Sequence, residues 1–162
     1  MSGRLNLFQT MMLRWRDMHP YSAVHVVRVP RPLGEVPLAE RIGRTLEARG
    51  LTGLVLDRRH SRFDYEGGPA EVTLEVLPGG ADPLGVVCRE IERHLNLPFP
   101  HEARENPFRF FAVTSADSFH LGLAYDHFIA GGESFILVHS FNPCLHYRIS
   151  CRKLPGHLPV FI

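Results

Sequence analysis

The sequence predicts an α/β (α+β) fold in which helices pack on a mixed sheet. Two segments, 38–46 and 84–95, repeat apolar residues every three or four positions, as amphipathic helices do. Three others, 23–29, 108–113 and 119–126, are rich in β-branched and aromatic residues or alternate in character, as strands do. The chain has 162 residues, of which 44% are apolar and 22% charged, so we expect one domain with a real core.

The first third of the chain predicts a helix, a strand and a second helix. Over 5–16, four apolar residues recur at helical spacing, and we expect this stripe to pack inward: Leu5, Phe8, Met12 and Trp15. The strand over 23–29 is stopped by prolines, and we expect His25 within it to be buried and hydrogen-bonded. The second helix ends near Gly50, a residue typical of helix termini.

The middle of the chain predicts two strands, 51–57 and 71–77, with a hairpin-like stretch between them. This stretch carries a small basic run that could grip a phosphate, although a solvated loop is the favoured interpretation: Arg58, Arg59, His60 and Arg62. Asp82 followed by Pro83 then marks the start of a third helix, which continues to Asn96. A loop, a strand over 108–113 and a short link lead into a hairpin with the next strand.

The stretch 117–134 organises the chain, because a strand there runs into a solitary histidine and a double glycine. Alternate residues of the strand fall on opposite faces, which places His127 at its end. Gly131 and Gly132 permit a sharp turn, and Ser134 then stands where it would cap a helix. A histidine at such a junction is fixed in place and can still meet a ligand.

Composition and charge exclude several functional classes. The formal net charge of +1, with both signs interspersed, offers no footprint for nucleic acid. The three cysteines are an odd number, which favours reduced thiols and a cytoplasmic location. We expect neither a signal peptide nor a membrane span, because no apolar run is long enough.

The heptad from Asp126 to Gly132, followed by Ser134, resembles the HHxxxDG motif of the chloramphenicol acetyltransferase-like superfamily, which includes the condensation domains of peptide synthetases. The resemblance is supported by the Pro107-Phe108-Arg109 segment, by Asp117-x-x-x-Leu121, and by the amino-terminal MMLRWRDMHPYSAVHVV. It implies that 1–138 form the amino-terminal half of such an acyltransferase domain. Residues 139–162 are expected to be an irregular carboxyl-terminal tail.

Two positions depart from the family pattern. The segment in this chain is therefore HxxxD-like but lacks the aspartate. Asp126 replaces the first histidine, and Gly131 replaces the aspartate that orders the site. The resemblance therefore implies His127 as the catalytic residue, a general base for attack of an amine or alcohol on an acyl thioester linked to coenzyme A or to a carrier protein. It also implies a substrate-binding neighbourhood: Asp126, Gly131, Gly132 and Ser134. From the residues alone, Asp126 is expected to be an exposed strand-end aspartate.

Three hypotheses follow. In the first, the acyltransferase site is completed by a second copy of the chain, as a homo-oligomer, or by a separate second-half chain, and no cofactor is bound. In the second, the domain is a catalytically inactive remnant or a binding module. In the third, the tail gathers a metal ion through residues whose spacing matches no short-loop zinc pattern: His139, Cys144, His146, Cys151 and His157.

Overall fold

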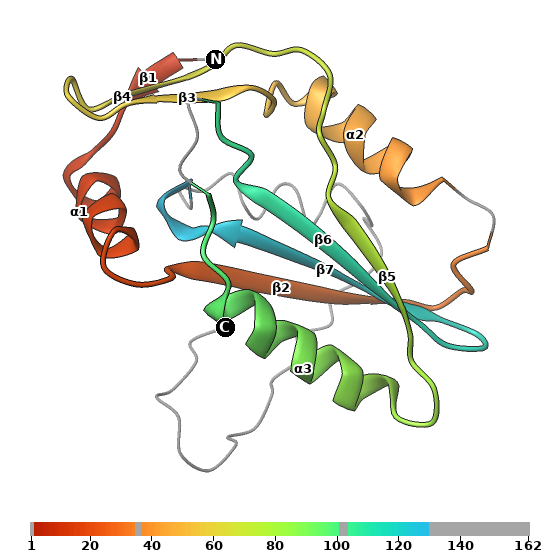
Figure 1. Cartoon of the computed structure of the whole chain (residues 1–162). Helices are drawn as coiled ribbons and strands as arrows, with labels where there is room; N and C mark the ends of the chain where they lie inside the picture. The colour runs from red at the N-terminus through yellow and green to blue at the C-terminus, as the bar shows by residue number, and fades with distance from the viewer. Residues whose placement is uncertain (1, 35–36, 101–103, 130–162) are drawn as a thin grey trace.

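A four-stranded sheet and a three-stranded sheet organise the computed structural model, which describes residues 2–34, 37–100 and 104–129 (Figure 1). In chain order the elements are β1 (Ser2–Arg4), α1 (Leu7–Arg16), β2 (Ser22–Val29), α2 (Leu38–Ala48), β3 (Leu54–Asp57), β4 (Arg62–Tyr65), β5 (Leu74–Pro78), α3 (Pro83–Asn96), β6 (Phe108–Thr114), β7 (Phe119–Asp126) and the 3-10 turn η1 (His127–Ile129). The expected fold class, helices packed on mixed strands, is confirmed.

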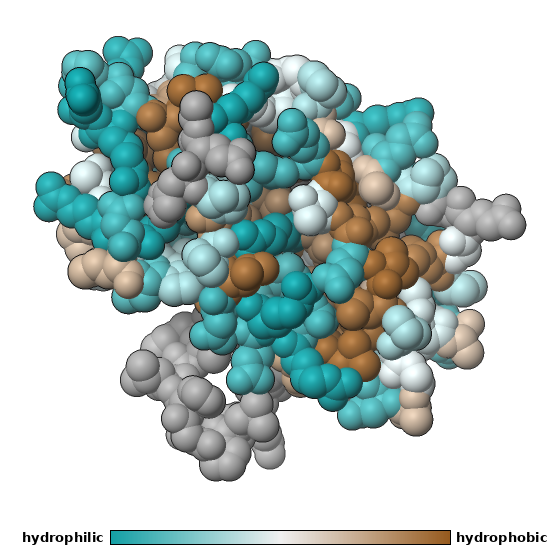
Figure 2. All heavy atoms as spheres, in the orientation of Figure 1, coloured by the Kyte–Doolittle hydropathy of each residue, from teal (hydrophilic) through white to brown (hydrophobic). Residues whose placement is uncertain are grey.

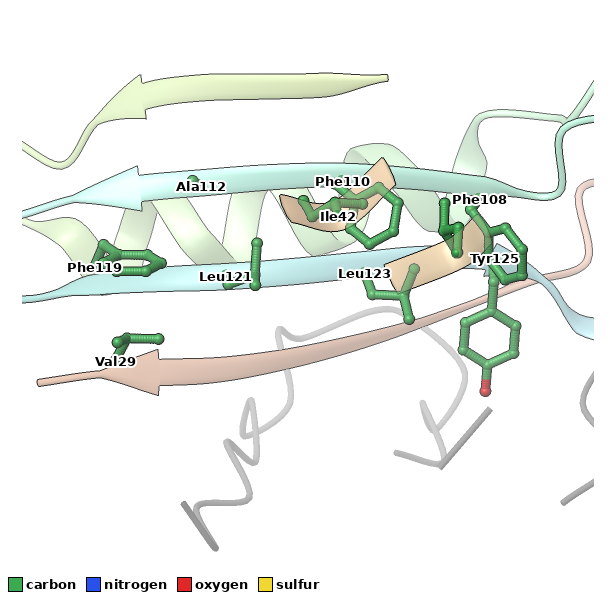
Figure 3. Packing of buried hydrophobic residues seen from close by; sticks show 10 residues of the cluster. Val29, Ile42, Phe108, Phe110, Ala112, Phe119, Leu121, Leu123 and Tyr125 are labelled. Carbon is green, nitrogen blue, oxygen red and sulfur yellow. The ribbon is translucent and has the colours of Figure 1, made fainter. Parts of the chain in front are cut away.

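The four-stranded sheet has the order β2-β7-β6-β5, in which β5 runs parallel to β6 and the other neighbours are antiparallel. Helix α3 packs on one face through Val87 and Ile91. Helix α2 packs on the other through Ile42 and Leu46, among aromatic and aliphatic residues of the inner strands (Figure 3). Because β7 lies between two strands and two helices, all of its residues are buried. Its carboxyl end is therefore buried within the sheet.

A close approach inside this sheet requires glycine at position 122. A Cβ atom placed on Gly122 would lie 2.2 Å from the ring of Phe111, its register partner on β6. That separation is well below van der Waals contact, so the ring occupies the space that a side chain would need.

The three-stranded sheet, ordered β1-β4-β3, packs with α1 beside the end of β7. The predicted inward stripe of α1 is wrong in part: Leu5 and Met12 are buried, whereas Phe8 is 54% and Trp15 37% exposed. Among the described residues, the buried side of helix α1 carries Met12, Leu13 and Arg16. The buried side of α1 therefore includes Arg16, whereas Phe8 and Trp15, which the apolar pattern predicted to be buried, are exposed.

The other predicted elements are confirmed with small shifts. Asp82 caps α3, its Oδ1 accepting from the amide of Gly85 at 2.9 Å. The hairpin-like stretch is the antiparallel pair β3–β4, while β5 joins the other sheet instead. The basic run is exposed, and Arg58 is ion-paired with Asp17, as expected of a solvated loop.

Hydrophobic side chains gather at the surface over β5, the edge strand of the four-stranded sheet, where Val76 is 53% exposed (Figure 2). Among the described residues, no helix has the length and apolar character needed to cross a membrane. The predicted tail, 139–162, lies outside the described residues.

Candidate functional site

His127 lies directly after the last residue of β7, at the start of η1, as the sequence predicts. Its backbone amide donates to the carbonyl oxygen of Tyr21 at 3.0 Å, which extends the β2–β7 register by one further step. The imidazole is half-buried, with Nδ1 enclosed and without a hydrogen-bond partner among the described residues. The ring is therefore held at the sheet's end without being sealed inside the core.

Four other rings form a series of contacts with this imidazole, three of them on or next to β2 and β7 and the fourth, Trp15, on α1. We call the set the ring row: Trp15, Tyr21, His127, Tyr125 and His25. The centroid of His127 lies 5.0 Å from that of Tyr21 and 6.3 Å from that of Tyr125. Residues two apart on a strand share a face, so the alternation of β2 and β7 places the four rings other than Trp15 on one side of the sheet.

His25 and Tyr125 form a hydrogen-bonded pair at the inner part of the ring row. Their rings are stacked with centroids 5.5 Å apart and planes 3° from parallel, and Nε2 of His25 lies 3.0 Å from the hydroxyl oxygen of Tyr125. Figure 3 shows Tyr125 at the end of the buried cluster, with its hydroxyl directed away from the other members. His25 is thus hydrogen-bonded, as expected, although it is only half-buried.

Burial lowers the pKa of His127, because a charged imidazole loses solvation there. Burial also lowers the pKa of His25, and the positive charge of a protonated His127 lowers it further. Both imidazoles are consequently neutral at pH 7, and a neutral imidazole is the form that accepts a proton.

The expectation that Asp126 is exposed is wrong. Its side chain is buried on the side opposite the ring row, where Oδ2 lies 3.0 Å from Nε of Arg16. The N–H is not aimed at the carboxylate, so the contact is an ion pair without a hydrogen bond. Arg16 also donates from Nη1 to Oε2 of Glu105 at 2.8 Å, and hence one cation lies between two carboxylates.

Burial raises the pKa of Asp126 to about 6. Arg16 opposes this effect, while the nearby carboxylate of Glu105 adds to it. Desolvation therefore outweighs the attraction of the single arginine that two carboxylates share. The carboxyl group next to His127 in sequence titrates close to neutral pH.

Arg16 is absent from the site residues predicted from the sequence, although the sequence carries a signal for it. Arg16 follows Met12 by four residues and Leu13 by three, so it falls on the buried side of α1. A charge on the core side of an amphipathic helix needs a buried partner, and an acidic residue at a buried strand end is a natural candidate.

The remaining predicted site residues, Gly131, Gly132 and Ser134, lie outside the described residues, as do the tail residues of the metal hypothesis. Among the residues that the structure describes, no group of three or more histidine, cysteine, aspartate or glutamate side chains could hold a metal ion. The described part of the candidate site is thus the strand end with its ring row on one side and the Arg16 ion pairs on the other.

This architecture is similar to part of the fold of the condensation domains of nonribosomal peptide synthetases. The first condensation domain of the calcium-dependent antibiotic synthetase, solved with a substrate analogue, superposes with a TM-score of 0.67 at 18% identity, over 83% of this chain and 35% of that one. A mutant starter condensation domain of rhizomide synthetase gives 0.66 at 15% identity, over 86% and 36%. Another mutant of that domain, solved with C8-CoA, gives 0.64 at 15%, over 85% and 34%.

The match covers most of this chain but only about a third of the length of those domains. No protein-family model and no curated protein sequence matches the chain. The likeness therefore establishes the fold, and the resemblance inferred from the motif is confirmed at that level.

Proposed function

We propose that this chain is an acyltransferase-like domain of the condensation type, in which His127 is the general base for attack of an amine or alcohol on an acyl thioester. The observation that carries the proposal is the presentation of a neutral, half-buried imidazole at the strand end of a condensation-domain fold. The burial that lowers the pKa of His127 keeps the ring ready to accept a proton at neutral pH.

In this mechanism the acceptor's nitrogen or oxygen attacks the thioester carbonyl carbon while its proton passes to His127. Because Nδ1 is enclosed, we assign the proton to Nε2. The C–S bond then breaks, and the departing thiolate takes the proton back from the imidazolium, which restores the neutral ring. General-base help of this kind contributes roughly a hundred- to ten-thousand-fold in rate.

The acyl donor in this proposal is a thioester of coenzyme A or of a carrier protein, and no bound cofactor is required. The rhizomide synthetase domain solved with C8-CoA supports a thioester donor, since it has the same fold. Gly131, Gly132 and Ser134 are proposed to border the substrate on the motif resemblance alone. A cytoplasmic location also stays a prediction from the cysteine content.

The proposed active site needs a second protein surface, opposite His127, to enclose the reacting groups. The chain spans only 34 to 36% of the length of the solved domains, so we propose that the site is completed by a second copy of the chain or by a separate second-half chain. The alternative is a catalytically inactive remnant or binding module. The glycine at position 131, where the motif has aspartate, favours this alternative.

An acyl-transfer assay with acyl-CoA thioesters separates the two functions. Wild type, His127→Ala and the control His60→Ala are compared, and the mass of each is measured in solution. His60 is an exposed histidine paired with Asp57, away from the ring row. The proposal expects His127→Ala to lose at least a hundredfold in rate and His60→Ala to lose nothing. A wild-type chain that self-associates in solution and binds an acyl thioester without turnover supports the binding module and excludes an acyltransferase completed by a second copy of the chain.

A further inference from the structure

We propose that Arg16 is the positioning residue of this site, because its guanidinium holds both residues that flank His127 in the chain. The catalytic consequence rests on the proposed function, whereas the positioning itself does not. Arg16 lies on α1, more than a hundred residues before the histidine in the sequence, and no pattern near the motif points to it.

Arg16 makes one contact with each of the two residues that flank His127. Nε of Arg16 lies 3.0 Å from Oδ2 of Asp126, and Cζ lies 5.6 Å from the ring centroid of Phe128. Both flanking side chains are buried, Asp126 to 1% and Phe128 to 2% exposure. Because the peptide unit is planar and each residue has only two soft backbone torsions, fixing both neighbours leaves His127 little freedom to move.

Arg16 can act in this way because its own position is fixed by other segments. Nη1 donates to Oε2 of Glu105 at 2.8 Å, and Nη2 donates to the carbonyl oxygen of Pro100 at 3.2 Å. The guanidinium thus meets a carboxylate and a carbonyl from the segment before β6, in addition to the two flanks of His127. A planar cation with several donors suits this arrangement, and a lysine ammonium has no plane to set against the Phe128 ring.

The backbone supplies reporters of this effect. The amide of Asp126 donates to the carbonyl oxygen of Pro107 at 3.1 Å, and the amide of His127 donates to that of Tyr21 at 3.0 Å. If Arg16 fixes the positions of Asp126 and Phe128, removal of its guanidinium should weaken these two hydrogen bonds more than the hydrogen bonds at the centre of the sheet.

The test measures amide hydrogen exchange and the imidazole NMR titration of His127 in the full chain. Arg16→Met is the main variant, and Arg14→Met, an exposed arginine on the same helix, is the control. We expect about tenfold faster exchange at Asp126 and His127 in Arg16→Met relative to β7 amides such as Ala124, and a His127 titration midpoint closer to that of a free imidazole. Arg14→Met should match wild type in both.

Two further variants keep the test decisive if Arg16→Met does not fold. Arg16→Lys retains the charge between the carboxylates, and we expect intermediate exchange because the contact with Phe128 is lost. Asp126→Asn retains the Arg16–Glu105 pair and removes one of the two grips, so exchange at His127 should again rise. A folded Arg16 variant with unchanged exchange and an unchanged His127 titration overturns the proposal.

The outcome is separable from that of the proposed function, since neither measurement needs turnover. If the chain is active, Arg16→Lys should lower kcat with little change in KM, because the base is displaced while the substrate surface is kept. If the self-associated chain is inactive and the exchange result holds, the positioning role stands and the acyltransferase completed by a second copy fails. If kcat falls and the His127 measurements do not change, Arg16 acts by another route and the proposal is wrong.

Discussion

Asp126→Asn replaces a buried carboxyl group by a neutral amide of nearly the same shape, and its effect on stability should depend on pH. The carboxyl has a pKa of about 6 in the folded chain, chiefly because of burial, against 3.8 for an ordinary aspartate. The folded state therefore binds this proton more tightly than the unfolded state does. The resulting stabilisation is complete below about pH 4 and is lost as the pH rises through the window from about 4 to about 6.

The size of this effect follows from the two pKa values. A gap from 3.8 to about 6 corresponds to about 3 kcal/mol over the whole window, at 1.36 kcal/mol for each pH unit. Between pH 5 and pH 7.5 the loss is about 1.4 kcal/mol, because the folded carboxyl is still largely protonated at pH 5 while the unfolded one is ionised. The asparagine variant has no such proton and should not show this part of the pH dependence.

The assay is urea unfolding of wild type and Asp126→Asn at pH 5.0 and 7.5. The free energy of unfolding of the variant, relative to wild type, should be higher at pH 7.5 than at pH 5.0 by about 1.4 kcal/mol. This double difference cancels any fixed cost of the amide, and Asp117→Asn, an exposed carboxyl in the β6–β7 turn, is the control. Equal differences at both pH values would refute the argument from burial, and the opposite sign would mean that the Arg16 ion pair outweighs desolvation.

Two further predictions concern the buried sheet. His94 on α3 is buried against Phe111, and burial lowers its pKa, so the stability it contributes is present above pH 6.5 and is lost below it. His94→Phe, which keeps the ring, should therefore lose less stability than wild type between pH 7.5 and 5.5, by at most about 1.4 kcal/mol in urea titrations, and an equal loss would contradict this. Gly122→Ala, whose Cβ would meet the Phe111 ring at 2.2 Å, should cost about 1–3 kcal/mol. The control Gly43→Ala on α2, with its nearest neighbour, Val72, at 3.5 Å, should gain about 0.5–1 kcal/mol, and thermal unfolding that ranks the two in the opposite order would refute the packing argument.

Asp126 combines a cost in stability with a gain in geometry at the strand end. A neutral residue at position 126 would remove the unfavourable burial of a charge, yet it would also remove one of the two grips on the chain beside His127. The carboxylate is thus costly for stability and useful for geometry, as is common where a fold holds a reactive group.

Local patterns were sufficient to predict most of the elements. The repeat of Ile42 and Leu46 and the Asp82 cap act within a few residues of chain, so α2 and α3 could be located without knowledge of the rest. The alternation of β7 likewise placed His127 at a strand end, where the structure has it. The exposed side of α1 could not be predicted, because Phe8 and Trp15 have the same apolar character as Met12 and differ only in which side meets the sheets.

The sequence by itself determined the class of fold, the strand that ends in a histidine, and the motif that points to acyl transfer, since each depends on residues close together in the chain. Only the tertiary structure decided the surroundings of that histidine. Whether Asp126 meets water or Arg16 depends on where α1 packs, and α1 is separated from β7 by most of the described chain. Burial and ion pairing are properties of contacts between distant segments, so the pKa of Asp126 and the hold of Arg16 on the strand end appear only when those segments meet.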